Sequence, residues 1–70
     1  MHIRSSAIVS DHDILGGIPV FEGTRVPAKT LIDYLEKGHT LDEFLDDFPT
    51  VKLSQARTLL ADLKQELVAG

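Results

Sequence analysis

Glycine and proline punctuate the first part of this 70-residue chain so closely that no long helix can run through it. They stand at positions 16, 17, 19, 23 and 27, and they separate short runs of residues that favour strands. Residues 7–9 form one such run. Residues 19–21 and 24–26 are expected to pair across a Glu22-Gly23 turn, because glycine supplies the positive φ of a tight hairpin. The sequence therefore predicts an N-terminal β-hairpin arm over residues 1–27.

Helical spacing replaces this pattern after Pro27, whose fixed φ suits the first position of a helix. Leu31, Ile32 and Leu35 recur at helical spacing until Gly38, a residue that commonly follows a helix end. These positions predict a first helix between residues 27 and 38.

A second helix is predicted to begin at Thr40, because Glu43 stands three residues later and completes a capping box. Pro49 ends it. The third helix has a continuous apolar face made of Ala56, Leu59, Leu60, Leu63 and Leu67. Its N-cap is ambiguous: Lys52 has the right spacing but cannot accept a hydrogen bond, so Ser54 is the alternative.

Together these elements predict an α+β fold, in which the hairpin precedes a three-helix unit of helix-turn-helix type over residues 28–70. A chain of this length buries a thin core, so we expect a homodimer joined through the strand edges. The absence of cysteine excludes disulfides and thiolate chemistry and fits the cytoplasm. No run approaches the length of a membrane helix, and the first residues lack the apolar core of a signal peptide.

The formal net charge is −4, and the acidity is concentrated in residues 31–51, where Lys37 is the only lysine or arginine beside six carboxylates. This balance argues against indiscriminate nucleic-acid binding, which depends on Lys and Arg contacts to phosphate. We interpret the acidic side of the second helix chiefly as a solvated face. If it contacts a basic protein partner, the candidate residues are Asp42, Asp46 and Asp47.

The start of the third helix is the candidate nucleic-acid surface, because a helix-turn-helix presents this end of its last helix to the major groove. The residues expected to point outward there are Lys52, Ser54, Gln55, Arg57 and Thr58. Arg57 suits guanine or phosphate, Gln55 suits adenine, and Lys52 suits phosphate.

Arg25 lies on the predicted hairpin, where we favour a structural ion pair with Asp33 or Glu36 over contact with a partner. The glycine-rich run before it lacks the Lys-Ser/Thr ending of a P-loop. His2, His12 and His39 with Asp11 and Asp13 could supply metal ligands, but an Asp-His-Asp loop before a strand is usually solvated, and no helical ligand pair accompanies it. No nucleophile elbow is present. We therefore expect no enzyme activity, no metal and no cofactor.

Residues 14–27, 31–38 and 40–49 carry a further signal. Its centre is Gly-Gly-x-Pro-Val-x-x-Gly-Thr-Arg-Val-Pro, which spans Gly16 to Pro27. On these residues the chain resembles a small prokaryotic family called domain of unknown function 433. The resemblance implies a homeodomain-like fold and a VapB-like antitoxin of a type II toxin–antitoxin pair, encoded beside a PIN-like ribonuclease toxin. Lys52 departs from the family, which usually has Ser or Thr there.

The resemblance and the residues lead to the same leading hypothesis, an antitoxin that binds a PIN-like toxin and operator DNA. A protein–protein adaptor without DNA activity remains the alternative, because the net charge separates the two only weakly.

Overall fold

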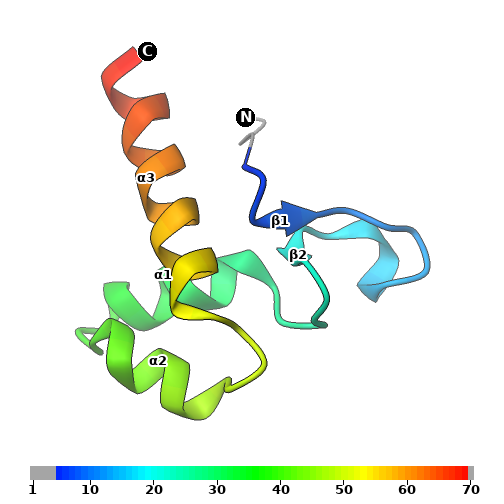
Figure 1. The fold of residues 1–70 in the computed structure, drawn as a ribbon, viewed down its shortest axis with the longest axis horizontal. Coiled ribbons are helices and arrows are strands. Elements are labelled where there is room, and N and C mark those ends of the chain that lie inside the picture. Colours follow the sequence, from blue (N-terminus) through cyan, green and yellow to red (C-terminus); the bar gives the residue numbers. More distant parts are fainter. Residues whose placement is uncertain (1–4, 70) are drawn as a thin grey trace.

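The fold is a pair of short strands followed by three helices, which confirms the α+β class (Figure 1). The computed structural model describes residues 5–69. The strands are β1 (Ile8–Val9) and β2 (Val20–Phe21), with the 3-10 helix η1 (Leu15–Gly17) between them. The helices are α1 (Ala28–Glu36), α2 (Leu41–Asp47) and α3 (Leu53–Ala69). Among the described residues, none of the helices is both long and apolar enough to cross a membrane.

The strands pair differently from the predicted hairpin. β2 runs antiparallel to β1, with Ile8 opposite Phe21 and Val9 opposite Val20. The expected partner, residues 24–26, returns beside β2 through a bond from the Phe21 amide to the Val26 carbonyl (2.9 Å). The pairing stays an isolated antiparallel bridge between Val20 and Pro27, in which the Ala28 amide also donates to the Pro19 carbonyl at 3.0 Å. It does not lengthen into a strand, because α1 begins at Ala28.

The predicted turn itself is present. Gly23 has a φ of +78°, which glycine adopts without strain. The hydroxyl of Thr24 donates to the Phe21 carbonyl at 2.8 Å and accepts from the Val26 amide at 3.0 Å. Thr24 therefore bends the chain at the point where the sequence suggested a second strand.

The core joins the strand pair to all three helices. Its largest fully buried side chains include Phe21 of β2, Leu31 of α1, Phe44 of α2 and Leu59 of α3. The ring centroids of Phe21 and Phe44 are 6.0 Å apart. Because an isolated pair of strands is marginal in water, this packing onto the helices is what stabilises it.

The corner between α1 and α2 is closed by hydrogen bonds. Gly38 has a φ of +89°, and its amide donates to the Leu35 carbonyl at 3.1 Å. The next amide, of His39, donates to the Tyr34 carbonyl at 2.9 Å. This is a Schellman motif, which satisfies carbonyls that the helix end leaves unpaired. At the other end of α1, Pro27 is the N-cap rather than the first helical residue, because its ψ is 139°.

One face of the first half of α3 is buried, whereas the last residues of the helix are exposed. Ala56 and Leu59 are 0% and 2% exposed, whereas Leu60 is half-buried. Leu67, the last residue of the predicted apolar face, is 81% exposed, so the fold does not cover the end of that face. The 17 residues of α3 make a helix about 25 Å long, and its C-terminal turns extend past the strands and α1 (Figure 1).

Candidate functional site

α2 and α3 are joined by the short connection 48–52, as expected for a helix-turn-helix. Phe48 and Pro49 are the first two residues of this connection. Val51 is buried, and its amide donates to the Phe48 carbonyl at 3.0 Å, which fixes the turn. In the view of Figure 1, α3 runs steeply upward, and the connection leads from the end of α2 to the lower, N-terminal end of α3.

The N-cap of α3 is Lys52, whose side chain cannot accept a hydrogen bond, so the Gln55 amide donates to the Lys52 carbonyl at 3.0 Å instead. The Gln55 Oε1 accepts from the Lys52 amide at 3.0 Å, which is one half of a capping box. Ser54 lies inside α3, so the alternative assignment of Ser54 as the cap is wrong. The Gln55 Nε2 donates to the Glu22 carbonyl at 2.9 Å. Gln55 thus ties the start of α3 to the turn of the N-terminal arm, and contact with a base would require these bonds to break.

The other residues predicted to contact DNA line the start of α3 with different exposures. Lys52, Ser54 and Arg57 are exposed, and Thr58 is half-buried. The positive charge at this end therefore comes from Lys52 and Arg57.

Arg25 belongs to the same region of the molecule. It lines a shallow hollow together with Gly23, Thr24 and Thr50, and Thr50 lies in the connection before α3. The expected ion pair of Arg25 with Asp33 or Glu36 is wrong: within residues 5–69, Asp33 pairs instead with Lys29 at 3.2 Å. An i,i+4 partner on the same helix is closer at hand than a side chain on the neighbouring turn. Arg25 is exposed, and its guanidinium forms no ion pair with the residues that the structure describes.

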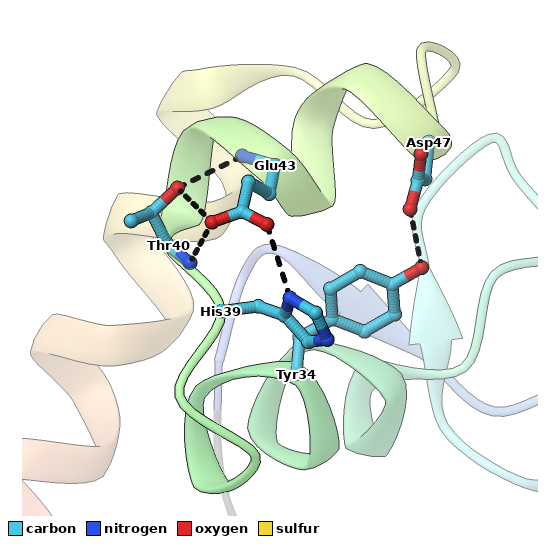
Figure 2. A network of polar contacts seen from close by, with 5 residues as sticks. All are labelled: Tyr34, His39, Thr40, Glu43 and Asp47. Carbon is cyan, nitrogen blue, oxygen red and sulfur yellow. Dashed lines mark hydrogen bonds and ion pairs between the residues drawn. The ribbon is translucent and has the colours of Figure 1, made fainter.

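The acidic side of α2 is divided between bonded and unbonded carboxylates. Figure 2 shows Glu43 between Thr40 and His39, and Asp47 beside Tyr34. The Glu43 Oε2 lies 3.0 Å from His39 Nδ1, and the Tyr34 hydroxyl donates to Asp47 Oδ2 at 2.7 Å. Asp42 and Asp46 are exposed, and among the described residues neither has a side-chain hydrogen bond or an ion pair. Of the three predicted partner-binding aspartates, Asp47 also has a structural role.

These contacts shift two pKa values. The hydrogen bond to His39, followed by the one from the Thr40 backbone, lowers the pKa of Glu43. The hydrogen bond to Asp47 raises the pKa of Tyr34, because deprotonation would break it and place two negative charges together.

The sequence reasoning missed Tyr34 and His39, although a signal for them was available. In a Schellman motif the third residue from the helix end contacts the second residue after the cap. Gly38 is the glycine expected in this motif, so its position predicts contact between Tyr34 and His39. The ring centroids of these two residues are 5.2 Å apart. The same tyrosine ring packs edge-on against Phe44 and Phe48 at 5.5 and 5.6 Å.

The Asp11-His12-Asp13 segment is a local turn, in which the Asp13 amide donates to Asp11 Oδ1 at 2.8 Å. Within residues 5–69, no three His, Asp or Glu side chains gather as a metal site would require. His2, the remaining candidate, lies outside the described residues.

The strand pair and the three helices that follow it define a small α+β protein with a three-helix C-terminal part. The family described as "Protein of unknown function (DUF433)" matches residues 8–61, and the chain belongs to this family. It is also 36% identical, over 50 residues, to the "Uncharacterized protein y4eO" of Sinorhizobium fredii (strain NBRC 101917 / NGR234). That match covers 71% of this chain and 23% of the relative, so the chain spans about a quarter of the relative's length. No solved structure matches the chain.

Proposed function

We propose that this chain is an antitoxin-type binding module, which contacts DNA through the start of α3 and a basic protein toxin through α2. The observation that carries the proposal is that Lys52 and Arg57 are exposed at the end of α3 that a helix-turn-helix offers to DNA. Arg25, also exposed, lines a hollow with Thr50 of the connection just before that end. Arg25 comes from a distant turn, and the Gln55 bond to Glu22 holds that turn against α3.

Charge separation supports two different partners. The start of α3 exposes cations, whereas α2 exposes Asp42 and Asp46 with Glu43 and Asp47 on the same helix. DNA would be repelled by α2 and attracted by the start of α3. A nuclease toxin needs a basic surface to bind RNA, so an acidic helix is complementary to it. The module carries out no reaction of its own, and its work on operator DNA would place it in the cytoplasm.

The DNA half of the proposal is tested by fluorescence titration of a labelled duplex from upstream of the gene, with a scrambled duplex beside it, at several salt concentrations. Arg57→Ala should weaken binding to the upstream duplex by about 1–3 kcal/mol and relax base preference. Lys52→Ala should weaken binding to both duplexes alike. It should also reduce the slope of log affinity against log salt concentration by about one unit. Lys64→Ala, which removes a cation near the other end of α3, is the matched control and should change neither.

The protein half is tested with the product of the neighbouring gene. Asp42→Asn and Asp46→Asn should weaken that complex and leave DNA binding unchanged or tighter. Asp11→Asn, an exposed carboxylate far along the chain from α2, is the control. If neither the protein nor its complex prefers the upstream duplex, the DNA proposal fails and the adaptor function is favoured.

A further inference from the structure

An apolar groove lies between the strand pair, α1 and α3. The apolar side chains that line it include Ile8 and Ile18 from the N-terminal arm, Ile32 of α1, and Leu59 and Leu63 of α3. Its volume is about 370 Å³. The groove is separate from the two surfaces proposed above, the start of α3 and the acidic side of α2. Ile18, which lines the groove, is 43% exposed.

The C-terminal turns of α3 carry apolar side chains that the fold leaves uncovered. Leu67 and Val68 are 81% and 73% exposed. At about 100° per residue, Leu67 falls on the same side of α3 as Leu63 and Ala56. This face is therefore continuous: its first half packs on the core, its middle borders the groove, and its end meets solvent.

We propose that a second copy of this chain fills the groove, so that the C-terminal turns of each α3 lie in the groove of the other. The contact is reciprocal, as a two-fold dimer requires. The two α3 helices then run antiparallel, and Leu67 of each helix packs beside Leu63 of its partner.

The exposed area suits such a dimer. The whole chain exposes 5030 Å². A compact monomer of 7.7 kDa is expected to expose about 4,300 Å². The surplus of roughly 700 Å² is spread over the whole surface, and the uncovered apolar side chains Ile18, Leu67 and Val68 contribute to it.

The charges also favour self-association on this face. α3 carries two cations and two carboxylates, and the groove is bordered by the ion pair of Lys29 with Asp33. Neither side of the contact has a net charge that would oppose a second copy. The α2 face is the opposite case, since two copies of its four carboxylates would repel each other.

The pairing has a consequence that rests on the proposed DNA function. With Leu67 level with the partner's Leu63, the two-fold axis passes near residue 65. At 1.5 Å per residue, the two Leu53 positions are then about 36 Å apart along the helices. Half-sites of helix-turn-helix dimers are about 34–36 Å apart. The dimer would thus present both α3 N-terminal ends one DNA turn apart.

The dimer is tested without DNA or toxin, so its failure is distinct from failure of the proposed function. Sedimentation of the full chain from micromolar to millimolar concentration should show a monomer–dimer equilibrium. Leu67→Lys should raise the dimer dissociation constant on the order of tenfold or more, because it places an unpaired charge in an apolar contact. Its monomer should keep the circular dichroism and melting temperature of the wild type, since Leu67 is 81% exposed.

Gln65→Lys is the matched control, because Gln65 is exposed and lies about 160° around α3 from Leu67. It should leave the dissociation constant unchanged. A wild type that stays monomeric over the whole range would overturn the proposal, as would an unchanged dissociation constant for Leu67→Lys.

A charge swap tests the occupant of the groove. Leu67→Lys and Ile18→Glu chains should each dimerise weakly alone. When they are mixed, one contact joins the new lysine to the new glutamate and the other contact is unaltered, so the mixed dimer should form several-fold more tightly than either homodimer. If mixing brings no gain, the α3 end does not occupy the groove and the proposed arrangement is wrong.

Discussion

The corner between α1 and α2 and the C-terminal half of α3 use their apolar side chains in opposite ways. In the corner, Tyr34, Phe44 and Phe48 pack together, and the capping box and the Schellman motif satisfy the backbone around them. In the last turns of α3, Leu67 and Val68 face solvent. The corner and the first half of α3 therefore hold the fold together, whereas the C-terminal turns of α3 extend beyond it with apolar side chains uncovered.

The largest expected effect separates the two regions directly. Phe44→Ala should destabilise the monomer by about 3–5 kcal/mol, because it empties a fully buried position among three other aromatic rings. Leu67→Ala should change it by less than about 0.5 kcal/mol. Urea unfolding, at a concentration where the wild type is monomeric, measures both. Similar losses for the two variants would show that the end of α3 belongs to the core.

The next comparison locates the boundary within α3. Leu59→Ala should cost about 2–5 kcal/mol, because Leu59 is 2% exposed. Leu60→Ala should cost less, although the apolar spacing places both residues on one stripe, because Leu60 is only half-buried. Thermal melts of the two variants side by side provide the measurement. An equal or larger loss for Leu60→Ala would mean that α3 is rotated relative to this structure.

A smaller effect compares the two helix starts. Thr40→Ala should cost about 0.5–2 kcal/mol, because it removes the hydroxyl that accepts from the Glu43 amide. Ser54→Ala should cost less than about 0.5 kcal/mol, because Ser54 is exposed and lies inside α3 rather than at its cap. Chemical unfolding of both variants checks the pair. A greater loss of stability for Ser54→Ala than for Thr40→Ala would show that Ser54 is the N-cap of α3.

These regions also show where sequence reasoning succeeds. Thr40, Glu43 and Gly38 act on amides and carbonyls within a few residues, so their spacing alone predicts the caps. Whether Leu67 is buried depends on whether another helix or strand packs against the end of α3, and helical periodicity does not contain this information. The α+β class was also predictable, because glycine and proline positions and helical spacing are local features of the sequence.

The candidate site was predictable only in part, because it is assembled from distant segments. The helical spacing was enough to put Lys52 and Arg57 at the exposed start of α3. Arg25 reaches the same end of the molecule through a turn 33 residues before Gln55, held by the bond to Glu22. A single sequence gives no sign of such a long-range bond.

The smallest expected effect concerns acid stability at the α1–α2 corner. The pKa of Glu43 is lowered in the folded protein, first by the hydrogen bond to His39 and then by the one from the Thr40 backbone. Because the folded pKa lies below the unfolded value of about 4.3, the carboxylate stabilises the fold above that value, and the contribution is lost as the pH falls through the folded pKa. The urea midpoint of the wild type should therefore fall more steeply between about pH 5 and pH 3 than that of Glu43→Gln. Asp42→Asn, which removes an exposed carboxylate one residue away, should keep the wild-type slope. Parallel slopes for the wild type and Glu43→Gln would show that the exposed bond to His39 is too weak in solution to affect folding.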